Sequence, residues 1–318
     1  MKAQDILGLL GGLALFLYGM NMMSGGLEDV AGKNLEFILE RLTNRKIKAI
    51  IVGILLTCIM QSSSAMTVML IGFVNAGLMN LTRTVWVVMG ANIGTTITGQ
   101  MIAFDIGVFA PLLAIIGVVL IVFFSHHKLN TFGEIIAGIG ILFMGLDIMS
   151  QSMLPLQSSN LFLNFMSSVS HPLLALAIGA MFTGIIQSSS ASIGILQKLA
   201  MQGLVAFPQA VYFLLGFDIG TCMTAFIASS SGCRNSKRLA LFHLFFNLIG
   251  AGLFIVVCQF TPIISIVAEW SPNEPMRQIA NMHTLFNTVS VFVFMIIDHY
   301  VVQFIYFLLP LQSQETIK

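Results

Sequence analysis

Charged residues are scarce in this sequence. Asp, Glu, Lys and Arg make up only 8% of its 318 residues, whereas soluble domains carry about 25%. Hydrophobic residues make up 57%, and their runs are too long and too continuous for the alternating strands of an outer-membrane barrel. This composition excludes an ordinary soluble domain and predicts an all-α integral membrane protein that contacts the lipid bilayer.

Several functional signatures are also missing. The four cysteines have neither CxxC nor metal-ligand spacing, and no nucleophile–base set can be recognised. The net charge is +1 and there is no basic patch, as a nucleic-acid-binding protein would need. We therefore expect no enzymatic activity, no cofactor and no nucleic-acid partner.

What the sequence does contain is an internal repeat. Gln61-Ser62-Ser63-Ser64 and Gln187-Ser188-Ser189-Ser190, here called the first and second QSSS motifs, are identical and lie 126 residues apart. At the same offset each is followed by a polar segment rich in glycine, GANIGTT at 90–96 and GFDIGTC at 216–222. A single run of serines in a membrane helix usually bonds to a neighbouring helix. Two identical copies, each with its own glycine segment, favour a functional site.

The length of the apolar segments predicts how each motif sits in the membrane. Segments 47–78 and 172–204 have a QSSS motif near their centre. Each arm has about 14 residues, which is too short for a span of about 20 residues. We therefore predict two re-entrant helical hairpins with the motifs at their tips. The glycine segments predict discontinuous helices at 82–104 and 205–229.

These elements divide the chain into a first repeat at 1–128, a second repeat at 129–260 and an additional membrane helix at 275–310. Each repeat then contains three crossings, so the second repeat is inverted relative to the first. In this topology 11 of the 14 basic residues lie on one side, which the positive-inside rule makes cytoplasmic. We expect a multi-pass protein of the cell membrane with its N-terminus outside and its C-terminus inside.

Irregular backbone at membrane depth is stable only in protein or around a water-filled site. Helix N-termini and serine hydroxyls at such breaks donate hydrogen bonds to an anion. Carbonyl, amide and hydroxyl oxygens suit a hard cation such as sodium. Because the membrane segments hold almost no basic residue, an anion here needs neutralising by bound cations, which predicts cation-coupled symport.

Individual polar residues allow more than one interpretation. Asp218 is an acid at predicted midplane depth, where ionisable groups are functional by default; a structural hydrogen bond is the alternative to cation binding. His243 with Asn247, and His283 with Asn287, share a helix face and predict interhelical hydrogen bonds, with a role in the site or in proton relay as the alternative. Two further predictions concern charged or polar residues outside the motifs. Lys198 is expected to reach an interface, with direct contact to the anion as the alternative. The repeat partners Asn21 and Asp147 are expected to be structural.

The paired motifs resemble those of the type II sodium-dependent inorganic phosphate cotransporters, and the resemblance covers about residues 5–309. The resemblance implies that phosphate binds to Gln61, Ser62, Ser63, Ser64, Gln187, Ser188, Ser189 and Ser190. The candidate sodium ligands are Gln61, Asn92, Thr95, Thr96, Gln187, Asp218 and Thr221. Asp218 and Cys222 depart from the Asn and Thr that the family often has there, which leaves the sodium count and electrogenicity open.

The resemblance implies a bacterial sodium–phosphate importer in a short form without a PhoU-like regulatory domain. It also implies a moving core and a fixed scaffold, similar to elevator-type carriers, and a homodimer is expected. Two alternatives stay open. One is a cation-coupled carrier of another anion such as a dicarboxylate, with sodium or protons as the coupling ion. The other is a phosphate-selective channel or sensor.

Overall fold

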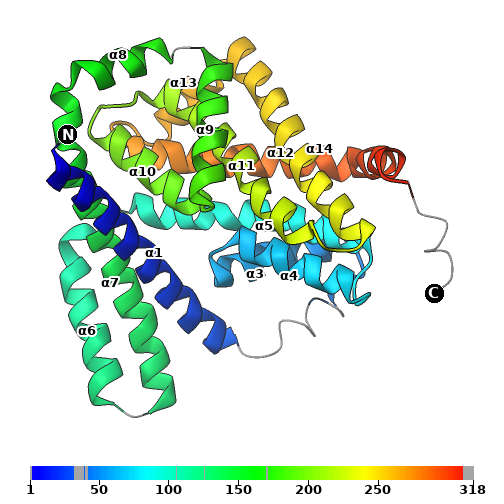
Figure 1. The fold of residues 1–318 in the computed structure, drawn as a ribbon, viewed down its shortest axis with the longest axis horizontal. Helices are drawn as coiled ribbons and strands as arrows, with labels where there is room; N and C mark the ends of the chain where they lie inside the picture. Colours follow the sequence, from blue (N-terminus) through cyan, green and yellow to red (C-terminus); the bar gives the residue numbers. More distant parts are fainter. Residues whose placement is uncertain are drawn as a thin grey trace.

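The structure is a computed structural model, and it describes residues 2–31, 39, 42–104, 106–124, 126–169 and 171–310. These residues form α-helices and two 3-10 turns, Gly107–Phe109 and Leu154–Ser158. The α-helices are, in chain order, α1 (Ala3–Ala31), α3 (Lys46–Met60), α4 (Ser63–Asn75), α5 (Leu81–Ala103), α6 (Ala110–Phe123), α7 (His127–Met153), α8 (Asn160–Ser168), α9 (Pro172–Ile186), α10 (Ser189–Met201), α11 (Phe207–Ser229), α12 (Arg234–Phe260), α13 (Ile263–Glu269) and α14 (Pro275–Leu308) (Figure 1).

Many helices present apolar side chains outward. Within the described ranges, five helical segments are long and apolar enough to cross a membrane, and the bent pair of α5 and α6 adds a sixth if it forms one span. Large side chains such as Leu7 and Ile185 are 70% and 79% exposed, which is costly in water but suits a lipid-facing surface. The helices thus support the predicted multi-pass membrane protein, and the additional C-terminal helix is observed as α14.

The internal repeat of the sequence is also a repeat of local structure. Helices α3, α4 and α5 begin and end 126 residues before α9, α10 and α11, respectively. In both copies a helix of 15 residues and one of 13 residues are joined at the QSSS motif. The predicted helix–break–helix arrangement is therefore present twice. The inverted orientation of the repeats and the re-entrant position of the hairpins remain predictions.

The predicted discontinuous helices are wrong. Both α5 and α11 continue through the glycine segments without a break. The glycines instead allow close helix packing. A Cβ atom at Gly90 would clash with the carbonyl oxygen of Ile50 in α3, and one at Gly216 would clash with that of Leu176 in α9. Small residues at such crossings let helix backbones approach closely.

Helix α1 lies along α7, which also packs against α6 (Figure 1). Glycines again form the contact, since Cβ atoms at Gly12 and Gly145 would lie 2.7 and 2.6 Å from each other's carbonyl oxygens. Helix α1 is long enough to include Glu28, close to its C-terminal end. The part of α1 from Leu17 to Glu28 reaches the QSSS motifs.

Candidate substrate site

Each QSSS motif begins with a glutamine that ends a helix. Gln61 and Gln187 have φ angles of 51° and 60°, a left-handed conformation that is uncommon outside glycine. The backbone N–H of Gln61 donates to Thr57 O at 2.8 Å, and that of Gln187 donates to Thr183 O at 2.7 Å. Each side-chain amide also donates to a carbonyl three residues earlier, that of Cys58 or Gly184. The glutamines thus satisfy the last carbonyls of α3 and α9 and turn the chain.

The next residue in each motif starts a new helix. Ser62 and Ser188 are extended, and their Oγ atoms accept hydrogen bonds from the N–H groups of Ala65 and Ala191 at 3.1 and 3.2 Å. In such a cap the first N–H groups of the helix have no partner within the helix. The N-termini of α4 and α10 therefore present donors where an anion is favoured.

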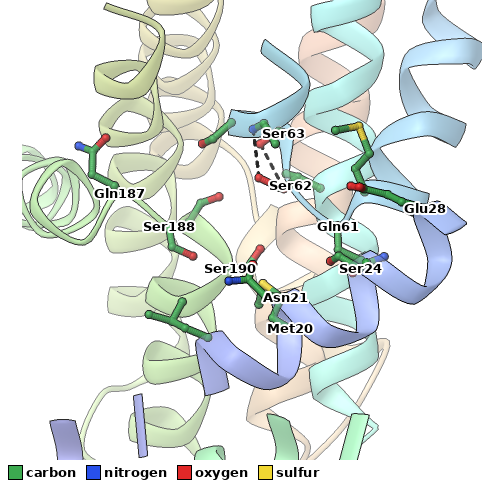
Figure 2. Close-up of a pocket in the computed structure, with 17 residues that line it drawn as sticks. Met20, Asn21, Ser24, Glu28, Gln61, Ser62, Ser63, Gln187, Ser188 and Ser190 are labelled. Carbon is green, nitrogen blue, oxygen red and sulfur yellow. Dashed lines mark hydrogen bonds between the residues drawn. The ribbon is translucent and has the colours of Figure 1, made fainter. Parts of the chain in front are cut away.

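The two motifs meet at one pocket of about 410 Å³. Figure 2 shows the two turns facing each other across this pocket, with α1 along one side. All eight residues predicted to bind phosphate line it. Residues that are 126 positions apart in the sequence thus line one pocket, and their binding of phosphate stays a prediction.

The predicted sodium ligands do not all reach this pocket. Gln61, Gln187 and Thr95 line it. Ser63 Oγ donates to Thr95 Oγ1 at 3.4 Å, and Thr98 Oγ1 donates to Gln61 Oε1 at 2.8 Å. Helix α5 therefore holds the first motif through these two side-chain hydrogen bonds.

Three other predicted sodium ligands lie outside the pocket lining, and each donates to a carbonyl of its own helix. Asn92 Nδ2 donates to Val88 O at 2.9 Å, Thr96 Oγ1 to Ile93 O at 2.8 Å and Thr221 Oγ1 to Phe217 O at 3.0 Å. These bonds follow from the unbroken helices, because the backbone around the three side chains is regular.

Asp218 is buried at a separate site where α11, α12 and α14 meet. His283 Nε2 lies 3.1 and 3.2 Å from its two carboxylate oxygens, and Asn287 Nδ2 donates to Oδ2 at 2.8 Å. Asn247 Nδ2 lies 3.2 Å from Cys222 Sγ. The predicted interhelical hydrogen bonds are thereby confirmed for His283, Asn247 and Asn287. The prediction is wrong for His243, whose ring nitrogens bond to none of the described residues.

This Asp218 cluster also contains polar atoms without partners. Within the described residues, both ring nitrogens of His243 and the side-chain oxygens of Asn247 and Asn287 are buried and have no hydrogen bond. Unpaired buried polar atoms are costly. An ion or a water molecule bound beside the carboxylate would satisfy them.

Sequence reasoning missed the contribution of α1 to the pocket. One face of this helix lines it through Leu17, Met20, Asn21, Ser24, Gly25 and Glu28. The spacing of these residues is that of a single helical face, and three polar side chains on one face of an apolar helix were the signal. Asn21, expected to be structural, is thus a pocket residue.

Lys198 does not reach an interface as predicted. Its side chain is 1% exposed, and Nζ lies 3.4 Å from Asp147 Oδ1 of α7. A buried lysine needs a partner of opposite charge, and Asp147 supplies it across 51 residues of sequence. A structural role for Asp147 is consistent with this ion pair and stays a prediction. Lys198 is outside the pocket lining.

Comparison with known proteins identifies relatives along most of the chain. The chain is 34% identical to the uncharacterized protein YqeW of Bacillus subtilis over 299 residues. This alignment covers 94% of this chain and 96% of YqeW. It is 30% identical to the putative inorganic phosphate export protein YjbB of Salmonella typhimurium over 89% of this chain, but spans only 52% of that longer protein. The chain is 31% identical to the sodium-dependent phosphate transport protein 2A of Rattus norvegicus over a shorter alignment. That alignment covers 30% of this chain and 15% of the rat protein.

No solved structure matches the chain. The sequence pattern of one family, described as Na+/Pi-cotransporter, matches twice in succession, over residues 15–151 and 152–269. Each match contains one QSSS motif, so the two faces of the pocket come from the two matched units. The chain belongs to the Na+/Pi-cotransporter family.

Proposed function

We propose that this protein is a secondary transporter that binds inorganic phosphate between its two QSSS motifs and carries it together with sodium. The observation that supports this most strongly is the meeting of both motifs, each with a capped helix N-terminus, at one pocket. The family membership and the names of the relatives from Salmonella and rat agree with phosphate as the substrate.

The pocket offers phosphate donors from two directions. The hydroxyls of Ser63, Ser64, Ser189 and Ser190 lie at the starts of α4 and α10, where the helix dipole also favours negative charge. A tetrahedral anion has oxygens pointing to all sides. Donors from two opposed turns therefore fit it better than those from a single turn.

The lack of basic side chains supports coupling to a cation. Within the described lining of the pocket there is no Lys, Arg or His. Phosphate carries one or two negative charges near neutral pH, and donors alone leave this charge largely uncompensated. Sodium ions held by hydroxyl and amide oxygens, including those of Thr95 and Gln61, would neutralise it.

We propose net import, because an inward sodium gradient drives a symporter in that direction. The export named for YjbB is the alternative, and the gradients present would decide the direction. We also propose that the hairpins re-enter the membrane so that the pocket lies near its midplane. The N-terminus is then outside and the C-terminus cytoplasmic.

A binding experiment tests the site itself. A ligand that binds only the folded protein raises its stability by RT ln(1 + [L]/Kd), about 2.7 kcal/mol at 100 times Kd. We expect phosphate with sodium chloride to raise the Tm of the detergent-purified protein, and phosphate with potassium chloride to raise it much less. A dicarboxylate that stabilises the protein while phosphate does not would favour the alternative carrier.

Asp218 provides a separate test of sodium coupling. We propose that its carboxylate and the unpaired oxygens of Asn247 and Asn287 hold a coupling sodium ion. Replacing Asp218 by asparagine keeps the size of the side chain but removes its charge. We expect the half-saturating sodium concentration for uptake to rise about tenfold, equivalent to about 1.4 kcal/mol.

The matched control is Asp5→Asn, which removes a half-buried carboxylate at the start of α1, distant in sequence from Asp218. If the sodium titration of the Asp218→Asn protein were the same as that of the unmodified protein, Asp218 would not bind the coupling sodium ion. Its role would then be limited to its hydrogen bonds with His283 and Asn287.

A further inference from the structure

Glu28 is the one ionisable side chain among the described residues that line the QSSS pocket. It lies in the penultimate turn of α1 and is half-buried. Figure 2 shows its carboxylate directed from α1 towards the first QSSS motif. A negative group facing a pocket for a negative substrate needs a physical explanation.

The carboxylate of Glu28 has no competing partner in the described parts of the chain. Within those ranges it makes neither a hydrogen bond nor an ion pair. Its neighbours on the same face of α1 are Ser24, one turn earlier, and Asn21. Residues spaced by three and four positions on a helix lie next to one another. The face thus groups one carboxylate with two neutral side-chain oxygens, which is the ligand chemistry of hard cations.

We infer that Glu28 is a sodium-binding residue of the QSSS pocket and makes phosphate binding conditional on sodium. This inference rests on the proposed function and assigns a residue of α1 to it. In the low dielectric of a membrane protein, an ionised Glu28 repels phosphate. A sodium ion held by Glu28 and the oxygens beside it cancels the repulsion and attracts the anion. Each ligand then raises the affinity of the other, as thermodynamic linkage requires.

The inference predicts an unusual gain of function. Glu28→Gln keeps the shape of the side chain but removes the charge, so phosphate no longer needs a cation at this position. In the unmodified protein we expect phosphate affinity to be about 10-fold higher in sodium than in potassium, within the usual range of coupling between sites. In Glu28→Gln we expect this ratio to fall towards one, because affinity in potassium rises. A general loss of structure would instead lower the affinity in both salts.

The experiment uses the purified full chain in detergent and measures two quantities. The first is binding of radioactive sodium without phosphate, and the second is equilibrium binding of radiolabelled phosphate in sodium and in potassium. Asp29→Asn is the matched control, since Asp29 is adjacent but exposed and outside the pocket lining. Glu28→Asp retains the charge on a shorter side chain, so sodium dependence should persist with weaker sodium binding.

The outcomes separate this inference from the proposed function. Weaker sodium binding in Glu28→Gln, together with a sodium-to-potassium ratio of phosphate affinity closer to one, is the expected result. A Glu28→Gln protein with the sodium binding and sodium-to-potassium ratio of the unmodified protein would overturn the inference and leave the function standing. An unmodified protein that binds sodium through Glu28 but binds no phosphate would contradict the proposed function while supporting the cation site.

Discussion

Replacing Ser63 or Ser189 by alanine is expected to lower the apparent affinity for phosphate by a factor of about 10–100. The two residues occupy equivalent positions at the starts of α4 and α10, and both line the pocket. A hydrogen bond to a charged group contributes about 1.5–3 kcal/mol, which corresponds to this range. The double variant should show almost no uptake at phosphate concentrations that saturate the unmodified protein.

The effect is measured as the phosphate concentration that gives half-maximal uptake, at saturating sodium. Ser229→Ala is the matched control. Ser229 is buried in α11, bonds to the carbonyl of Phe226 and lies outside the pocket lining. If Ser63→Ala and Ser189→Ala both had normal phosphate affinity, the QSSS pocket would not be the substrate site. An effect of Ser229→Ala as large as theirs would indicate a loss of structure instead.

Replacing Gly90 or Gly216 by alanine is expected to destabilise the protein strongly. The added methyl group would clash with the carbonyl oxygen of Ile50 or Leu176, which belong to the backbone of a packed helix and cannot rotate away. Overpacking of this kind costs about 1–3 kcal/mol or more. The strain should also disturb the site, because α3 and α9 end at the QSSS motifs.

Gly72→Ala makes the same chemical change in α4, where a Cβ atom would meet no other atom within 4 Å. Because alanine is the better helix former by about 1 kcal/mol, this variant should be as stable as the unmodified protein or more so. The measurement is the Tm of the purified proteins in one detergent. If Gly90→Ala and Gly216→Ala had the same Tm as Gly72→Ala, the close packing of α5 on α3 and of α11 on α9 would be refuted.

The repeat was the part of the structure that sequence predicted best. Identical motifs at a fixed offset imply identical local structure. The two helix breaks, and their meeting at one pocket, could therefore be predicted from the sequence. The glycine segments were misread because glycine serves two opposite purposes. It permits an irregular backbone, and it also allows two regular helices to touch. Only the positions of Ile50 and Leu176 against Gly90 and Gly216 distinguish these purposes.

Contacts between distant helices could not be predicted in the same way. The pairing of Lys198 with Asp147, and of His283 with Asp218, depends on how α7, α10, α11 and α14 pack. A single sequence carries no signal for such pairs. Glu28 was a different case, because its spacing from Asn21 and Ser24 was visible. Its role was missed because the sequence alone does not show that this face of α1 meets the QSSS motifs.

The most direct test of the proposed function is uptake of radiolabelled phosphate into proteoliposomes that contain the purified protein. One set of vesicles receives an inward sodium gradient and the other an equal potassium gradient. We predict that phosphate accumulates above its external concentration with sodium only, and that the Ser63→Ala/Ser189→Ala double variant abolishes this accumulation. Equal, non-concentrative entry under both gradients would contradict sodium-coupled transport and indicate a channel.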